Sequence, residues 1–153
     1  MSDLVSLFQK LDYGPAPESD QPAQQWLESH NHSFGFYLNG NWEMPEDAEL
    51  FSVENPATGE QLATCRQAGS REITQALSGA KEAQLKWEKL TGHQRSKYLY
   101  ALAREMQQHS RVLSVLETLD NGKPFRESRD IDIPLAVRHF YYHAGWAQSV
   151  SYT

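Results

Sequence analysis

The chain has 153 residues, of which 39% are hydrophobic and 22% are charged. These proportions are typical of a chain that buries a core of its own, and they exclude a disordered segment and a membrane-spanning protein. The single cysteine, Cys65, excludes a disulfide framework and any multi-cysteine zinc or iron–sulfur site within the chain. A formal net charge of −6 argues against a nucleic-acid partner.

The chain shows neither a cleavable signal peptide nor an apolar run near the ~20 residues of a spanning helix. We therefore expect a cytoplasmic protein with no membrane partner. Charge is unevenly distributed: residues 1–60 hold eleven acidic residues and one basic residue, whereas residues 61–153 hold nine acidic and thirteen basic. The two halves are thus expected to be built differently.

Prolines punctuate the first half, so only short elements fit between them. Apolar residues at helical spacing predict a short amphipathic helix over residues 4–11. A second short helix over residues 21–29 is expected to bury Trp26 and Leu27. Residues 1–34 are predicted to form a helical leader.

Two β-hairpins are predicted after this leader, within residues 35–67. The first joins two aromatic runs, residues 36–38 and 41–43, around Asn39-Gly40, the strongest short hairpin signal. The second pairs residues 50–53 with residues 61–65 across the turn at residues 55–59, which contains Asn, Pro and Gly.

From Ser70 onward the pattern is helical. An apolar stripe behind an N-cap at Ser70 predicts a helix over residues 70–87, and Thr91 with Gln94 predicts a capping box that opens the next helix. The stripe comprises Ile73, Ala76, Leu77, Ala80, Gln84 and Trp87, and the buried face of the next helix is expected to carry Tyr98, Leu99, Leu102 and Met106.

Two further helices complete the predicted order. The first begins at Ser110 and stops at Gly122, and its apolar residues cover more than one face, so it should be the most enclosed. The last helix is expected to be capped by Asp130 or Asp132, with Pro134 in its first turn. Its inward residues would be Val137, Phe140, Tyr141 and Ala144.

The predicted fold class is mainly α with two short β-hairpins, and residues 68–153 form an incomplete helical part of a larger domain. No strand follows the last helix to cover it. We therefore expect the chain to be the front portion of something larger.

Candidate chemical groups are few. His139 and His143 have the i, i+4 spacing of two metal ligands, but no catalytic Glu lies between them and no third ligand is evident, so ordinary, partly buried histidines are favoured. His30 and His32 are expected to be solvated loop histidines. Cys65 ends a predicted strand with no paired histidine, so a packed thiol is favoured over a nucleophile. No Gly-rich phosphate loop is present.

The two helices predicted over residues 70–108 carry some basic charge, which raises the alternative of a DNA-reading helix-turn-helix. The acidic first half opposes it, because phosphate contacts need an unopposed basic face. The residues alone therefore predict a mainly helical domain without a complete active site.

Five segments in register resemble the amino-terminal part of an aldehyde dehydrogenase. They are YLNGNW (37–42), VENPATGE (53–60), AKEAQLKW (80–87), LETLDNGKP (116–124) and YYHAGWA (141–147). Residues 11–19, LDYGPAPES, are similar to the leader of family 16 of that superfamily. The resemblance covers residues 35–148, and it departs from the family at His143 and Gln148.

The resemblance implies a parent α/β fold whose Rossmann-type cofactor sheet is missing from this chain, with residues 68–153 as the helical amino-terminal part of the incomplete cofactor-binding domain. The parent would oxidise aldehydes to carboxylic acids with NAD or NADP, through a cysteine thiolate and a glutamate that follow Thr153. This chain would hold no catalytic and no cofactor-binding residue, would bind no cofactor alone, and would be inactive alone. A homo-oligomeric parent is implied. The alternative is a non-catalytic scaffold or interaction protein of the same family.

The resemblance also implies two sites. Leu135 and His139 would line one wall of a substrate entry tunnel, although plain packing against the missing sheet is favoured for each. The Asp120 carboxylate with the backbone carbonyls of Val53 and Glu54 would hold a monovalent cation such as Na⁺ or K⁺. A plain helix stop at Asp120, with Lys123 as its cationic partner, is the alternative.

Overall fold

The structure is a computed structural model that describes residues 19–149. The helix expected over residues 4–11 and the leader segment 11–18 lie outside the described residues. Within them the protein is mainly helical with a few short strands, as predicted.

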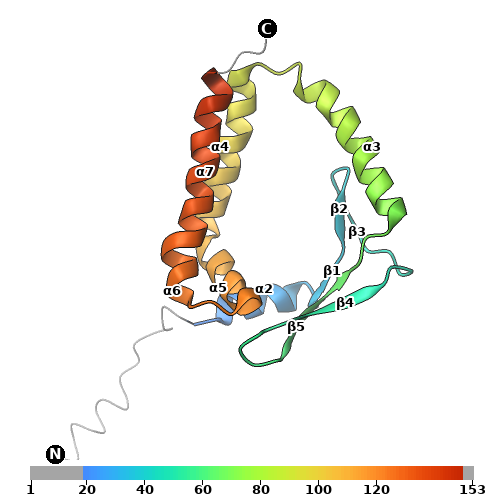
Figure 1. The fold of residues 1–153 in the computed structure, drawn as a ribbon, viewed down its shortest axis with the longest axis vertical. Coiled ribbons are helices and arrows are strands. Elements are labelled where there is room, and N and C mark those ends of the chain that lie inside the picture. The colour runs from blue at the N-terminus through green and yellow to red at the C-terminus, as the bar shows by residue number, and fades with distance from the viewer. Residues whose placement is uncertain (1–18, 150–153) are drawn as a thin grey trace, which may run out of the picture.

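The elements follow one another in a simple order (Figure 1). None of the described helices is both long enough and apolar enough to cross a membrane. The helices are α2 (Gln21–Ser29), α3 (Ser70–Trp87), α4 (Gly92–Gln108), α5 (Ser110–Asn121), α6 (Phe125–Glu127) and α7 (Ile133–Ser149), with a π-helical turn η1 (Ser128–Asp132) between α6 and α7. The strands are β1 (Ser33–Phe34), β2 (Phe36–Leu38), β3 (Asn41–Glu43), β4 (Leu50–Glu54) and β5 (Gln61–Arg66).

Both predicted hairpins are confirmed, and one further strand, β1, was not predicted. β2 and β3 pair antiparallel around Asn39 and Gly40, which take φ angles of 52° and 85°, as a tight hairpin turn requires. β4 and β5 also pair antiparallel, and the short β1 adds to β5 in parallel to give the order β1-β5-β4. Two residues are too few to show an alternating pattern, so β1 gave no signal.

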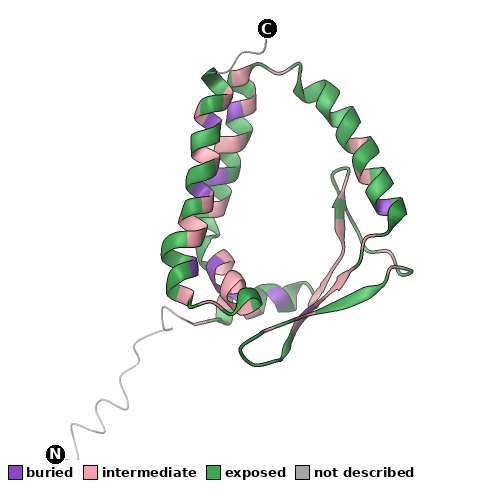
Figure 2. Cartoon of the chain, in the orientation of Figure 1, coloured by how far each residue is buried: buried purple, intermediate pink, exposed green. Residues whose placement is uncertain are grey.

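α4 and α7 lie side by side and supply much of the buried surface (Figures 1 and 2). Small residues let the two helices approach: Ser96 and Ala103 of α4 and Ala144 of α7 are fully buried. At Gly92, any Cβ would overlap the Ala147 carbonyl, so only glycine fits. Tyr141 of α7 donates a hydrogen bond to Gln107, 2.6 Å away.

The predicted buried face of α4 is therefore wrong in part. Tyr98 is 61% exposed and Leu102 is 45% exposed, because α7 packs against the face of α4 that carries small residues and not against the face that carries the largest side chains. Leu99 and Met106 are half-buried. The capping box at Thr91 and Gln94 is confirmed: the Gln94 amide donates to the Thr91 hydroxyl at 3.2 Å, and the Thr91 amide donates to the Gln94 side chain at 2.9 Å.

α3 is largely exposed (Figure 2). Ile73 and Leu77 of the predicted apolar stripe are each more than half exposed, so the described elements cover that stripe only in part, where the β2-β3 hairpin meets the helix near Gly79. The N-cap is Gly69 rather than Ser70, and the Glu72 carboxylate accepts the Gly69 amide at 2.9 Å, which fixes the start one residue earlier than expected.

α5 is the most enclosed helix, as predicted, and it ends at Gly122 in the left-handed region. The cap expected at Asp130 or Asp132 is wrong. The chain runs without a break from α6 through η1 into α7, so both aspartates lie inside the π-helical turn. Ser128 is fully buried there and accepts a hydrogen bond from Thr118 of α5 at 2.9 Å.

Near the start of the described chain, Leu27 is buried as predicted, but Trp26 is 39% exposed. Its indole stacks on Phe34 with ring centroids 5.3 Å apart, so it covers strand β1 from outside instead of entering the core. The predicted boundary at residue 34 falls at the end of β1, and it stays a prediction.

Candidate functional site

The turn between β4 and β5 packs against the end of α5. Within the turn, Asn55 accepts the Ala57 amide on its side chain at 2.9 Å and the Gly59 amide on its carbonyl at 2.7 Å. A Cβ on Gly122 would lie 2.7 Å from Cγ of Pro56, so the turn rests directly on the helix end. The sequence segments around Asn55-Pro56 and Asn121-Gly122 are thus neighbours in space.

An apolar cavity of about 360 Å³ lies beside this junction. Val53 of β4, Cys65 of β5 and Asp120 of α5 share its wall. The remaining lining residues are Leu27, Phe34, Leu62, Ala63, Leu113, Leu116, Glu117 and Ile133. Two of the three residues predicted to hold a cation, Val53 and Asp120, therefore lie at one cavity, and Glu54 follows Val53 at the hairpin end.

Cys65 is a half-buried thiol and not an activated one. Burial raises its pKa above the ordinary value, and the negative charge of Asp120 raises it further. Both effects favour the protonated form, whereas a nucleophile needs the thiolate. This agrees with the expectation of a packed thiol.

Asp120 is exposed, and its carboxylate makes no hydrogen bond or ion pair with any of residues 19–149. The expected rival partner, Lys123, is engaged elsewhere: its ammonium lies 2.8 Å from Glu117 and 2.8 Å from Asp132. The hydrogen bonds to Asp132 and then Glu117 raise the pKa of Lys123 well above its ordinary value. The Asp120 carboxylate therefore faces the negative end of the α5 dipole without this compensation.

Leu135 and His139 lie four residues apart on α7, hence on one face of the helix. Leu135 is 42% exposed and His139 is exposed. His143 is exposed as well, so the expectation that His139 and His143 are partly buried is wrong. Of the two loop histidines, His30 is exposed as expected, while His32 is half-buried and its Nδ1 lies 2.7 Å from the Leu62 carbonyl.

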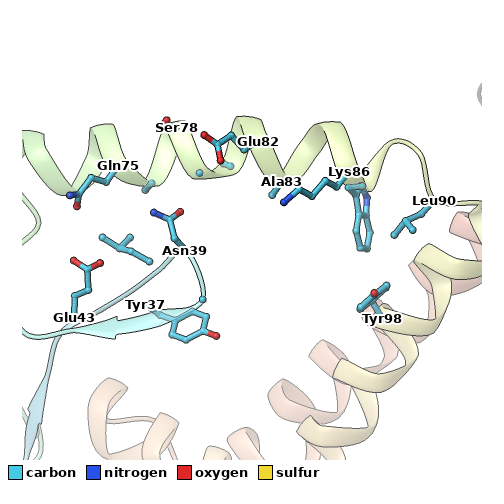
Figure 3. A pocket seen from close by; sticks show the side chains of 16 residues that line it. Tyr37, Asn39, Glu43, Gln75, Ser78, Glu82, Ala83, Lys86, Leu90 and Tyr98 are labelled. Carbon is cyan, nitrogen blue, oxygen red and sulfur yellow. The ribbon is translucent and has the colours of Figure 1, made fainter.

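A hollow of about 1040 Å³ opens between α3, the β2-β3 hairpin and the start of α4 (Figure 3). Glu43 from the hairpin and Glu82 and Lys86 from α3 contribute charges (Figure 3), and Trp87 and Tyr98 also line the hollow, with rings 5.4 Å apart. This hollow was not predicted from the sequence. Gly79 could have indicated it, because a glycine within a helix often marks a place where another segment approaches closely. Here the Asn39 side chain occupies the space that a Cβ at residue 79 would take.

The described residues hold no assembled nucleophile and base. Ser29 and His30 come within 3.0 Å, but they are adjacent in sequence, and the Ser29 hydroxyl donates to the Trp26 carbonyl at 2.7 Å. The pair closes the end of α2 and is exposed. No group of three or more His, Cys, Asp or Glu residues that could hold a metal ion occurs in residues 19–149.

The helix starts also fit a dinucleotide poorly. A nucleotide phosphate commonly binds free amides at a helix N-terminus. At α3 the Glu72 carboxylate already accepts the Gly69 amide and would repel a phosphate. At α4 the Thr91 and Gln94 side chains fill the cap. The residues described here thus do not form a phosphate-binding cradle at these two helices.

Comparison with known proteins gives a consistent result. The model of the aldehyde dehydrogenase family matches residues 42–153. Aldehyde dehydrogenase B of Escherichia coli (strain K12) is 37% identical over 108 residues, which make up 71% of this chain and 21% of the relative. HpcC from Thermus thermophilus superposes with a TM-score of 0.79 at 27% identity, covering 85% of this chain and 25% of its own.

A further structural neighbour is betaine aldehyde dehydrogenase from Staphylococcus aureus, whose structure is in complex with NAD⁺. It has a TM-score of 0.77 and 27% identity, over 84% of this chain and 25% of its own. The chain thus spans about a quarter of the length of the proteins that it matches.

Proposed function

This chain belongs to the aldehyde dehydrogenase family, and from that premise we propose that it is the amino-terminal portion of an NAD(P)-dependent enzyme that oxidises aldehydes to carboxylic acids. The observation that carries the proposal is the match of the family model to residues 42–153, in a chain that spans a quarter of its relatives. The NAD⁺ complex of a structural neighbour supports a nicotinamide cofactor for the parent.

In this proposal the chain alone supplies scaffold and no chemistry. The only cysteine is Cys65, whose raised pKa opposes nucleophilic attack. The starts of α3 and α4 are filled by their own side chains, which supports the absence of NAD or NADP binding by this chain alone. The aldehyde substrate and both catalytic groups belong to the parent.

The test uses the full 153-residue chain. We expect no aldehyde-dependent formation of NADH or NADPH, and no heat of binding when NAD⁺ or NADP⁺ is titrated in. Binding tighter than ~1 mM, about −4 kcal/mol, would contradict the proposal for the isolated chain. The sequence downstream of Thr153 separates the two parent functions: a cysteine and a glutamate at the family positions favour the enzyme, and loss of the cysteine favours a scaffold or interaction protein.

The parent is further proposed to be a cytoplasmic homo-oligomer with no nucleic-acid and no membrane partner. The acidic net charge supports the first exclusion, and the lack of a membrane-crossing helix in the described residues is compatible with the second. The exposed apolar residues of α3 support contact with further protein, either the rest of the parent or another subunit.

The cation site is also a proposal. Asp120 and the carbonyls of Val53 and Glu54 would hold a monovalent ion such as Na⁺ or K⁺, because oxygen ligands suit a hard cation. The contact between Pro56 and Gly122, the shared cavity of Val53 and Asp120, and the lack of any other described partner for the Asp120 carboxylate support it.

A melting experiment tests the cation site. We expect the midpoint of thermal unfolding to rise when KCl or NaCl replaces tetramethylammonium chloride at equal ionic strength. Asp120→Asn should abolish this ion-specific difference, whereas Asp47→Asn, which removes another exposed carboxylate, that of the Arg71 ion pair, should leave it unchanged. Because screening is the same at equal ionic strength, an equal response in both variants would show a general effect of the salt on the protein rather than binding at Asp120.

Leu135 and His139 stay proposed as one wall of the substrate tunnel of the parent. Their exposure on one face of α7 supports a role toward a missing element. In a longer chain that is active, Leu135→Trp should raise KM for bulky aldehydes more than for small ones, and a uniform loss of stability without this selectivity would favour plain packing.

A further inference from the structure

Two of the six histidines have rings that make no hydrogen bond or ion pair with a described residue. All six lie within residues 19–149. A ring nitrogen of each of the other four has a partner: the Trp26 carbonyl at 2.8 Å for His30, the Leu62 carbonyl at 2.7 Å for His32, the Gln148 side chain at 3.0 Å for His93, and Glu105 at 3.8 Å for His109. The side chains of His139 and His143 make no hydrogen bond or ion pair within this part of the chain.

These two histidines are also the pair that shares a helix face. They lie four residues apart on α7, both exposed, with ring centroids 6.4 Å apart and ring planes 21° from parallel. Tyr142 packs edge-on against His143, with centroids 5.3 Å apart, and so limits where that ring can turn. Four imidazole nitrogens are therefore presented together to solvent from a rigid helix.

The geometry points to a metal-binding role, and we propose that His139 and His143 form a two-histidine site for a divalent first-row ion of borderline softness, such as Ni²⁺, Cu²⁺ or Zn²⁺. Imidazole suits these ions, and two histidines at i, i+4 on a helix can ligate one ion. With metal–nitrogen distances of about 2.0–2.1 Å, the two rings need only turn toward each other. Water would complete the coordination.

The residues around His139 and His143 limit which further ligands and which ions this site can have. α7 carries no acidic residue, so no carboxylate on the helix serves as a third ligand or as a base. Its one charged side chain, Arg138, lines a separate cavity with Gln107 and Tyr141 and so faces away from the histidines. Two neutral imidazoles with no protein oxygen beside them suit Ni²⁺, Cu²⁺ or Zn²⁺ better than Na⁺ or K⁺, which separates this site from the one proposed at Asp120.

The test titrates NiCl₂ into the full chain, and His139→Asn and His143→Asn are the decisive variants. We expect one ion per chain, with each substitution weakening binding at least tenfold and the double substitution abolishing it. His109→Asn is the matched control, because His109 also faces an i−4 partner, Glu105, and Cys65→Ser removes the only thiol. Neither control should change the affinity.

Paramagnetic line broadening by Ni²⁺ in an NMR spectrum gives a second readout, which should be confined to residues of α7 near His139 and His143. Far-UV circular dichroism of metal-free variants checks that the substitutions leave the fold intact. Unchanged affinity in both decisive variants, equal loss in the His109→Asn control, or no binding up to about 1 mM Ni²⁺ would overturn the proposal. Because the readout is metal binding, its failure leaves the proposed dehydrogenase ancestry untouched.

Discussion

Gly122 is the position where one added methyl group should reveal how the β4-β5 turn is held against α5. The residue has a φ of +79°, which L side chains rarely adopt, and a Cβ there would lie 2.7 Å from Cγ of Pro56. Gly122→Ala therefore meets two separate penalties. One arises from the backbone conformation and the other from the contact with the turn.

The magnitudes separate these penalties. A left-handed φ costs an L-residue about 1–2 kcal/mol. Forcing an extra methyl group against a packed neighbour costs about 1–3 kcal/mol. Gly59 supplies a matched control, because it has a φ of +74° and no atom within 4 Å of the place that a Cβ would take. Gly59→Ala should thus lose only the first amount, and Gly122→Ala should lose the sum.

Urea unfolding, followed by circular dichroism, measures the free energy of unfolding for both variants. We expect Gly122→Ala to be less stable than Gly59→Ala by about 1–3 kcal/mol, with an unchanged dependence on urea. Adding Pro56→Ala to Gly122→Ala should recover part of this difference, since it removes the Cγ atom in the way. Equal losses in Gly122→Ala and Gly59→Ala would refute the contact between the turn and the helix.

Three further predictions follow from the ionisable groups and the exposed surface. Cys65 should react with iodoacetamide more slowly than a free thiol at pH 8, and Asp120→Asn should speed the reaction, because its charge helps to raise the Cys65 pKa. The raised pKa of Lys123 means that its ion pairs stabilise the fold below about pH 10.5 and that this stability is lost as pH rises further; Lys123→Gln should flatten that alkaline decline in urea midpoints. Analytical ultracentrifugation should show concentration-dependent self-association, reduced by Leu77→Lys on the exposed face of α3; a monomer at all concentrations would contradict this.

Local chemistry explains which elements were predictable. Asn39-Gly40 supplies the two positive φ angles of a tight turn, and Thr91 with Gln94 satisfies the first amides of α4, so neither needs a distant partner. Gly122 ends α5 for the same kind of reason. These signals lie within a few residues of the feature that they determine.

The sequence could not predict which helix faces are buried, because burial depends on elements that are distant along the chain. The apolar pattern of α4 favours Tyr98 and Leu102 as buried residues, yet α7 packs on Ser96 and Ala103 because small residues permit close approach. Val137 and Ala144 of α7 are buried as predicted, whereas Ile73 and Leu77 of the apolar stripe predicted on α3 are more than half exposed.

The candidate cation site also combines a part that could be predicted from the sequence with a part that only the structure shows. No local sequence motif connects Asp120 with Val53 and Glu54. Their prediction as one site rested on the family resemblance alone. The structure brings Val53 and Asp120 to one cavity through the packing of the β4-β5 turn on α5, which sequence spacing cannot report. The i, i+4 spacing of His139 and His143 could be seen in the sequence. The sequence could not show that both side chains are exposed and lack a hydrogen-bond or ion-pair partner among the described residues.

The π-helical turn η1 has a consequence for how this segment tolerates insertions and deletions. A π turn accommodates one residue more than an α turn, and each residue advances an α-helix by about 100°. Deleting one residue between Glu127 and Ile133 would convert the segment to continuous α-helix and rotate Ser128 away from its hydrogen bond with Thr118. Homologous chains that lack the π turn should therefore show a single-residue gap here, together with a compensating substitution at the position of Thr118 or Ser128.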